Sequence, residues 1–285
     1  MYLISNQLSR TVNWHFTSRC NMSCRYCFVP HCDEVSLFDS FIILERLRPY
    51  FSRINFVGGE PTYSTKLISL VRKAKELGFI VSMVTNGYRL YHDHEFFNSI
   101  IQYFSIIGVS IDSLRNDVNT KIGRKVGSSV LSKNEYIDLC KKIKKSNCLV
   151  KINTVVSKLN CDEDFNDFYA QVLPARIKVF QVLKPSFKLK NDYNDLLITD
   201  EQFQTFVERH SQFKNLICCE DNELMLNSYY MMNGEGCFLD NKTGKVGKSL
   251  LSCEIDEALK GICVDMQKYS RRYCKAWSAH TQLRQ

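Results

Sequence analysis

The sequence predicts an α/β fold, an open partial (βα)6 barrel with a C-terminal extension that covers the barrel mouth. Over the first two-thirds of the chain, six short runs rich in β-branched and aromatic residues alternate with segments whose apolar residues recur at helical spacing. Strands separated by helix-length segments form right-handed βαβ units and therefore a parallel sheet. With 285 residues, the chain is long enough to bury a full core.

The predicted elements follow one another in a regular order. Predicted strands cover residues 11–17, 54–57, 79–85, 105–111, 148–156 and 177–183. Predicted helices cover residues 37–50, 65–77, 94–102, 131–146 and 164–172. No linker rich in Gly, Pro or Ser divides this part of the sequence, so we predict that residues 1–198 form the barrel core.

After about residue 199, the alternation of strand-like and helix-like segments ends. A predicted helix at 200–210 is followed by hairpin-like sequence with turn signals at Asn233-Gly234 and at 242–244. We predict that residues 199–277 form an extension that packs on the barrel and closes it like a lid, and that 278–285 are a flexible tail.

The composition of the chain restricts the classes of protein to which it can belong. Thirteen cysteines, an odd number, fit poorly with a secreted disulfide framework, so clustered cysteines are better explained as metal ligands. The N-terminus lacks the features of a signal peptide, and the apolar runs are too short to span a bilayer. These observations predict a cytoplasmic protein without a membrane or nucleic-acid partner, and the net charge of +8 favours phosphorylated partners.

The most informative motif is CNMSCRYCF, which begins at Cys20 and also contains Cys24 and Cys27. By ligand spacing alone, two alternatives stay open: a zinc site completed by His15 or His31, and a redox pair of Cys24 and Cys27. Three cysteines can also bind three irons of a [4Fe–4S] cube and leave the fourth iron open. Because the motif follows the first predicted strand, it lies where parallel α/β folds place their active sites.

A second motif, Gly58-Gly59-Glu60-Pro61, closes the second predicted strand. Glycines let the backbone approach a ligand closely, and a carboxylate beside them suits an ammonium group. Small polar residues also follow later strands, at Thr85-Asn86-Gly87 and at Ser110 to Ser113. Each could equally be an ordinary turn.

Positive charge is predicted inside the barrel. Lys151 and Asn153 share one face of a predicted strand, and Arg176 and Lys178 share one face of the next, because side chains alternate with period two. Both faces of a barrel strand are covered, so unpaired cations there are costly. Either these residues pair with carboxylates or water at strand ends, or they converge on a polyanion such as a nucleoside triphosphate, which they would hold across the barrel mouth.

The two motifs resemble those of the radical S-adenosylmethionine (SAM) superfamily, and further segments resemble the viperin family within it. The resemblance runs in order from about residue 11 to about residue 260, through the segments VNWHFTSRCNMSCRYCF, INFVGGEP, IGR, VKINTVVSKLNCDEDFN, ARIKVFQVLKP, NSYYMMNGEGCFLDN and KSLLS. It implies the partial barrel of the radical SAM type and an antiviral lyase. Such enzymes convert a nucleoside triphosphate to its 3′-deoxy-3′,4′-didehydro analogue, a chain terminator, through abstraction of the C4′ hydrogen by a 5′-deoxyadenosyl radical.

The resemblance also implies cofactors and residue roles. One [4Fe–4S] cluster would bind Cys20, Cys24 and Cys27, with Glu60 among the catalytic residues. SAM would contact Tyr26, Gly58, Gly59, Glu60, Ser110, Arg124 and Asn153. The substrate would contact Asn13, Arg53, Lys151, Asn153, Arg176, Lys178 and Glu235. The triphosphate would be CTP, UTP or GTP, accompanied by Mg²⁺, and flavodoxin or ferredoxin would donate electrons.

This chain departs from the animal viperins at several positions. Arg53 replaces a lysine, Val57 replaces a serine, and Glu235 replaces a tyrosine near the ribose. The N-terminal amphipathic helix of the animal enzymes has no counterpart here, and eight residues follow Trp277. These departures favour a prokaryotic type that acts in antiphage defence. The alternatives are a GTP cyclase-like radical SAM enzyme, and a non-catalytic iron–sulfur protein that senses nucleotides.

Overall fold

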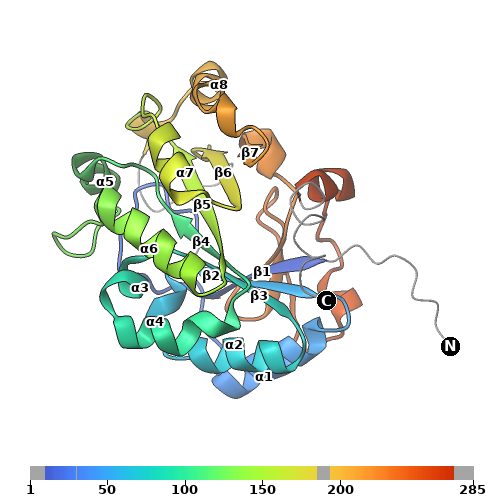
Figure 1. The fold of residues 1–285 in the computed structure, drawn as a ribbon. Helices are drawn as coiled ribbons and strands as arrows, with labels where there is room; N and C mark the ends of the chain where they lie inside the picture. The colour runs from blue at the N-terminus through green and yellow to red at the C-terminus, as the bar shows by residue number, and fades with distance from the viewer. Residues whose placement is uncertain (1–9, 30, 185–192, 273–285) are drawn as a thin grey trace.

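The computed structural model describes residues 10–29, 31–184 and 193–272, and within them the strands form one mixed sheet (Figure 1). The strands follow the order β10-β9-β8-β1-β2-β3-β4-β5-β6-β7 across the sheet. Neighbours from β1 through β7 are parallel, and so are β8 and β1, whereas β8, β9 and β10 pair antiparallel. Their bounds are β1 (Thr11–Thr17), β2 (Arg53–Gly58), β3 (Ile80–Thr85), β4 (Ile106–Ser110), β5 (Leu149–Val156), β6 (Arg176–Gln181), β7 (Ile217–Glu220), β8 (Tyr230–Met232), β9 (Cys237–Leu239) and β10 (Val246–Ser249).

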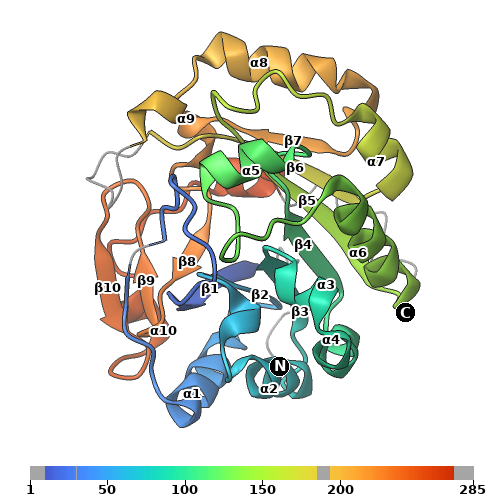
Figure 2. The same cartoon turned by 90° about the vertical axis from the view of Figure 1, so that its left-hand side faces the viewer.

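Helices connect the parallel strands and lie around the outside of the curved sheet, as Figure 2 shows for α1, α2, α4, α6, α7 and α8. This arrangement is the predicted open α/β barrel. The bounds are α1 (Leu37–Leu47), α2 (Leu67–Glu76), α3 (Tyr88–His92), α4 (His94–Ile100), α5 (Asn116–Ile122), α6 (Lys133–Lys145), α7 (Asn166–Val172), α8 (Asp200–Arg209), α9 (Asn222–Met225) and α10 (Ile255–Ala258). None of the described helices is both long and apolar enough to cross a membrane.

The six predicted strands are all present, with ends within two residues of those expected. The sequence did not predict α3 and α5, which are too short for a helical period to be visible. It also did not predict β7, which adds a seventh parallel strand beside β6. The four residues of β7, ICCE, are too few to show an alternation.

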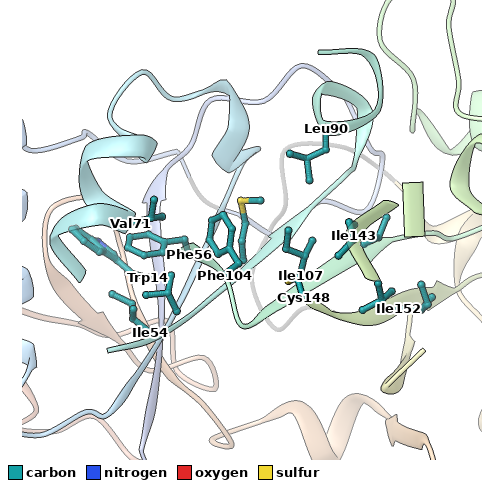
Figure 3. Close-up of a cluster of buried hydrophobic side chains, with 14 of the residues drawn as sticks. Trp14, Ile54, Phe56, Val71, Leu90, Phe104, Ile107, Ile143, Cys148 and Ile152 are labelled. Carbon is teal, nitrogen blue, oxygen red and sulfur yellow. The ribbon is translucent and has the colours of Figure 1, made fainter. Parts of the chain in front are cut away.

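The apolar core lies between the sheet and its helices. On β1 and β2, Trp14 and Phe56 are fully buried with ring centroids 6.0 Å apart, and Figure 3 shows them beside Ile54 and Val71. Helix α6 begins with a capping box in which Ser132 and Glu135 exchange hydrogen bonds, and this fixes where its apolar face begins.

The opposite face of the sheet, which points into the barrel, is polar. On β5 the residues alternate between fully buried apolar or Thr side chains and half-buried ones, and Lys151 and Asn153 belong to the second set. Across β1, β2 and β3, Asn55 Nδ2 donates to Asn13 Oδ1 (2.8 Å), and Ser82 Oγ donates to Asn55 Oδ1 (3.0 Å). The predicted strand-face pattern therefore holds, with the polar face inside the barrel.

The residues after 198 extend the sheet at both edges, because β7 joins β6 and β8 joins β1. The turn at 233–236 lies beside the loop after β1, where Val35 N donates to Gly234 O (3.2 Å). At the opposite end of the barrel, Thr11 N donates to the Tyr269 hydroxyl oxygen (2.6 Å). The extension thus reaches both ends of the barrel and not the mouth alone. The boundary at 198 stays a prediction, and the predicted tail 278–285 lies outside the described residues.

The bond between Tyr269 and Thr11 gives a test of how strongly the last described residues stabilise the barrel. Replacing Tyr269 with Phe leaves a buried backbone N–H unpaired, so Tyr269→Phe is expected to lower the free energy of unfolding by about 1–3 kcal/mol. Urea denaturation of the metal-free protein measures this. The control is Tyr230→Phe in the neighbouring ring, whose hydroxyl has only a weak contact of 3.7 Å to Met266 Sδ; equal losses in both variants would contradict the prediction.

Candidate active site

The loop after β1 carries the three cysteines of the sequence motif. Cys27 N donates to Cys24 O (3.1 Å), which closes a turn between the last two. The end of α5 holds the loop from the other side, because Ser23 N donates to Gly123 O (3.2 Å) and Arg25 N donates to Ile122 O (2.9 Å). Cys20, Cys24 and Cys27 are not joined in disulfides. Three free thiols on one short loop are the donor type that an iron–sulfur cluster requires, but within the described residues they do not come together as a ready metal-binding group.

The turn at the end of β2 packs against this loop through its backbone. Gly59 N donates to Thr17 O and Glu60 N donates to Arg19 O, both at 2.8 Å. Gly58 has φ +138°, a conformation that side chains disfavour, and a Cβ on Gly59 would lie 2.1 Å from Arg19 O. Both glycines are therefore required for the two loops to meet.

Glu60 has its carboxylate buried between the ends of β2 and β3. Oε1 accepts from Thr62 N, Thr62 Oγ1 and Thr85 Oγ1, and Oε2 accepts from Asn86 N (2.7 Å). Burial raises the pKa of this carboxyl even though four donors favour its charged form. Glu60 thus ties two strand ends together, while its predicted contact with SAM stays a prediction.

Tyr26 and Arg124 meet at a residue whose importance the sequence did not reveal, Asp112. The Tyr26 hydroxyl and Arg124 Nε both donate to Asp112 Oδ2 at 2.5 Å. Val155 N donates to Asp112 Oδ1 (2.9 Å), which anchors the carboxylate to β5. Two predicted SAM-contacting residues are therefore oriented through one buried carboxylate. Asp112 is visible in the sequence after the fourth strand, but nothing there pairs it with residue 26 or residue 124.

Ser110 and Asn153 are direct neighbours across β4 and β5. Asn153 Oδ1 is buried and has no hydrogen-bond partner among the described residues, and the same is true of His15 Nδ1. Burial lowers the pKa of His15 to about 4, so its ring is neutral at pH 7. Both atoms belong to side chains on the inner face of the barrel. Buried polar atoms without partners indicate that a polar ligand binds inside this barrel.

The predicted cations come together inside the barrel. Lys151 of β5 is the register partner of Arg176 on β6, and Asn153 is the partner of Lys178. Arg53 is the first residue of β2 and is buried. We expected these residues across the barrel mouth, and that expectation was wrong. Arg53 and Arg176 begin their strands, and Lys151 and Lys178 are each third, so all four lie in the amino-terminal halves.

Lys178 is paired with a carboxylate that the sequence analysis did not single out. Its Nζ lies 2.5 Å from Glu220 Oε1 and donates to the Tyr229 hydroxyl oxygen (2.8 Å). Arg272 Nη1 lies 2.5 Å from Glu220 Oε2. Arg176 Nη2 donates to Arg272 O (2.5 Å). The charge in this region stays positive, because one buried carboxylate neighbours several cations.

Lys151 differs from Lys178 in having no hydrogen bond or ion pair with any residue in the described part of the chain. A Cβ on Gly108 would lie 2.6 Å from Lys151 Cε, so the missing side chain of that glycine makes room for the lysine. Burial, together with the neighbouring Lys178 and Arg176, lowers the pKa of Lys151 to about 7. Burial likewise lowers the pKa of Lys178 to about 8 despite Glu220.

Asn13 and Glu235 were also predicted to face the substrate. Asn13 Nδ2 lies 3.4 Å from Tyr230 O, and its side chain belongs to the polar row inside the barrel. Glu235 lies in the turn between β8 and β9, where Ser249 Oγ donates to its carbonyl oxygen (2.7 Å). This turn lies close to Cys32, since Gly234 N is 3.4 Å from Cys32 Sγ. The roles of both residues stay predictions.

The close approach at Gly59 is testable without any ligand. A methyl group at residue 59 would overlap backbone, which cannot move aside as a side chain can, so Gly59→Ala is expected to destabilise the protein by about 3 kcal/mol. The control is Gly127→Ala, where a Cβ meets nothing within 4 Å and only the strain of φ +59° adds about 1 kcal/mol. Denaturation midpoints of both variants are compared; equal midpoints would refute the role assigned to Gly59.

The Radical SAM superfamily model matches residues 14–172. A protein of Flammeovirga pacifica named "S-adenosylmethionine-dependent nucleotide dehydratase" is 36% identical over 94% of this chain and 95% of its own length. One of the same name from Psychrobacter lutiphocae is 34% identical, covering 93% and 95%. The protein named "S-adenosylmethionine-dependent nucleotide dehydratase RSAD2" from Oncorhynchus mykiss is 32% identical, covering 94% and 80%.

Solved structures agree on the fold. Streptococcus suis SuiB bound to the precursor peptide SuiA superposes with a TM-score of 0.65 at 16% identity, over 93% of this chain and 67% of the other. The structure titled "Native anSMEcpe with bound AdoMet" gives 0.63 at 15% identity, over 94% and 84%. The sequence matches confirm the resemblance that the motifs carried, and the chain belongs to the radical SAM superfamily and, within it, to the viperin-type S-adenosylmethionine-dependent nucleotide dehydratases.

Proposed function

We propose that the protein is a radical SAM lyase that removes water from a nucleoside triphosphate and releases the 3′-deoxy-3′,4′-didehydro analogue, a chain terminator that acts in antiviral defence. The observation that carries the proposal is the set of cations on the inner face of the barrel, the buried Arg53 and Lys178 and the half-buried Lys151 and Arg176. A triphosphate is the natural partner for such a group, because guanidinium and ammonium groups bind phosphate oxygens through charge-assisted hydrogen bonds.

The cofactors belong at the other end of the barrel. Cys20, Cys24 and Cys27 would hold a [4Fe–4S] cluster, and SAM would bind between the cysteine loop, the turn at Gly58 and Gly59, and the ends of β4 and β5. When bound and reduced, these cofactors supply a 5′-deoxyadenosyl radical that takes a hydrogen atom from the substrate. Tyr26 and Arg124, oriented by Asp112, support the SAM side of this cavity.

Strand geometry supports the orientation of the substrate. Asn153 is two residues beyond Lys151 on the same face of β5, which is about 7 Å along the strand. A triphosphate that reaches from Lys151 and its register partner Arg176 to Lys178 would therefore leave the ribose at or beyond the level of Asn153, on the side of the cysteine loop. Asn153 Oδ1 and Asn13 would then be available to the ribose hydroxyl groups. This orientation brings the sugar, and not the phosphates, toward the cofactors.

The remaining parts of the proposal concern partners. CTP, UTP and GTP are the candidate substrates, each with Mg²⁺, and the turn that contains Glu235 is the candidate region for choosing the base. Flavodoxin or ferredoxin would supply electrons in the cytoplasm, where cluster thiols stay reduced.

The decisive experiment is an anaerobic assay of the reconstituted protein with SAM, a reductant and each nucleoside triphosphate in turn. We expect 5′-deoxyadenosine together with a product lighter than the substrate by one water, measured by mass spectrometry. A product that retains all atoms of the triphosphate would indicate the cyclase-like alternative. Equal, slow formation of 5′-deoxyadenosine with and without every triphosphate would refute the substrate class, and zinc retained in place of iron would refute the cluster.

The low pKa of Lys151 predicts a pH dependence of triphosphate binding. Phosphate binds the charged ammonium, which the free protein loses as the pH rises through about 7, so wild-type affinity should fall between pH 7 and pH 9. Lys151→Arg stays charged throughout. The ratio of the two dissociation constants should therefore change by roughly ten- to fifty-fold over this range, as measured by calorimetry.

Lys141→Arg on the outer face of α6, where Lys141 is exposed, serves as the matched control and should reproduce the wild-type profile. Titration of the phosphate itself, with a pKa near 6, affects all variants alike and cancels in the ratio. Parallel pH profiles for the wild type and Lys151→Arg would mean that Lys151 does not contact the triphosphate.

A further inference from the structure

The phosphate-facing side of the barrel contains a negative charge that a phosphate site would not be expected to keep. Glu220 ends β7 with its carboxylate almost fully buried. Three donors surround it: Lys178 Nζ at 2.5 Å, Arg272 Nη1 at 2.5 Å and the Tyr229 hydroxyl. We call these four residues the Glu220 group.

The Glu220 group joins segments that lie far apart in the sequence. Arg272 belongs to the last described residues, and its guanidinium also donates to Leu224 O (2.9 Å) and stacks on the Tyr229 ring at 3.8 Å. Its carbonyl oxygen accepts from Arg176 Nη2 (2.5 Å). Arg272 is therefore fixed on three sides. Lys178 Nζ makes one polar contact each with Glu220 and Tyr229 and lies about as far from two rings, 4.9 Å from that of Phe180 and 5.0 Å from that of Tyr229. Of the two cations, Lys178 is the one able to exchange its partner.

If Lys178 exchanges Glu220 for a phosphate, the charge of Glu220 must be compensated in another way. A phosphate that approaches Lys178 also approaches Glu220, and two anions repel each other strongly in a buried site. The repulsion is relieved only if another cation neutralises Glu220 when Lys178 turns toward the phosphate. Burial would raise the pKa of Glu220, but Lys178 and Arg272 outweigh burial and keep this carboxyl charged.

We propose, on the basis of the function proposed above, that Glu220 is a placeholder for phosphate: it binds Lys178 when the site is empty, and Arg272 neutralises Glu220 when Lys178 binds the triphosphate. Arg272 is then a positioning residue for phosphate binding that the C-terminal segment supplies. Glu220 prevents Lys178 from being an unpaired buried cation before substrate arrives.

The placeholder role predicts that substitutions of Arg272 and of Glu220 change phosphate affinity in opposite directions. Arg272→Met leaves Lys178 as the one cation of the Glu220 group, so phosphate affinity should fall about tenfold, the usual scale of one charge-assisted contact. Glu220→Gln removes the competitor and should strengthen phosphate binding several-fold. The double variant Glu220→Gln/Arg272→Met should recover wild-type affinity or better, because there is no longer a carboxylate to neutralise. A purely structural role predicts that the double variant binds no better than Arg272→Met.

The experiment measures binding of inorganic tripolyphosphate to the cluster-loaded, SAM-bound protein by calorimetry. In steady-state kinetics with the accepted nucleotide, the KM values of the variants should follow the same order as their dissociation constants for tripolyphosphate, and kcat should change less than twofold. Arg271→Met and Glu223→Gln are the matched controls, since Arg271 is exposed and Glu223 forms an exposed ion pair with Lys268; both should behave as wild type. Arg272→Lys, which keeps the charge, should restore part of the affinity.

The outcomes distinguish the placeholder role of Glu220 from a purely structural role. Recovery in the double variant supports the placeholder, and failure to recover, or weaker binding by Glu220→Gln, overturns it. If Arg272→Met does not fold, Tyr229→Phe replaces it: loss of one donor to Glu220 should weaken tripolyphosphate binding about threefold, and no change in affinity overturns the proposal. If tripolyphosphate binds in the predicted order but no nucleotide loses water, the function proposed above fails while the placeholder stands.

Discussion

The rest of the structure depends on one electrostatic constraint, the burial of several cations on the inner face of a parallel barrel. Lys151, Arg176 and Lys178 lie on the neighbouring strands β5 and β6 and face the barrel interior. Such an arrangement is unfavourable unless anions compensate it. Glu220 compensates one lysine within the protein, and Lys151 has no anionic partner among the described residues. A polyanionic ligand, as proposed above, would supply the negative charge that this inner face lacks.

The cysteine loop follows the carboxyl end of β1, whereas the cations lie in the amino-terminal halves of β2, β5 and β6, so the two groups lie toward opposite ends of the parallel sheet. The loop that carries Cys20, Cys24 and Cys27 follows β1, whereas Arg53 and Arg176 begin their strands. Between the two ends lies a row of neutral polar side chains, Asn13, Asn55 and Ser82, which bond to one another. Neutral hydrogen-bonding groups suit a ribose, and charged groups suit phosphates. In the orientation proposed above, the barrel would offer the ribose and the phosphates separate layers of matching side chains.

The sequence predicted the features that depend on local residue spacing. It missed the position of side chains along the barrel axis and the contacts between residues far apart in the sequence. Period-two alternation correctly placed Lys151 and Lys178 on the inner face. Alternation says nothing about position along the barrel axis, so the sequence wrongly placed these lysines at the barrel mouth. The cysteine motif and the Gly58–Gly59 turn are local and were recognised as motifs. Glu220 was missed because its partner Arg272 is 52 residues away, and the four residues of β7 show no period. Asp112 was visible, but its bonds to residues 26 and 124 arise only from the folded strand ends.

The C-terminal segment cannot be regarded only as a lid on a finished barrel. Its strands β8 and β7 complete the two edges of the parallel sheet, whose exposed N–H and C=O groups would otherwise remain unpaired. Its last described residues bond to the beginning of β1 through Tyr269 and to the beginning of β6 through Arg272. These contacts lie at the end of the barrel where the cations are. The same arginine thus joins the last described residues to the beginning of β6 and to Glu220, so under the function proposed above the phosphate side of the site depends on this attachment.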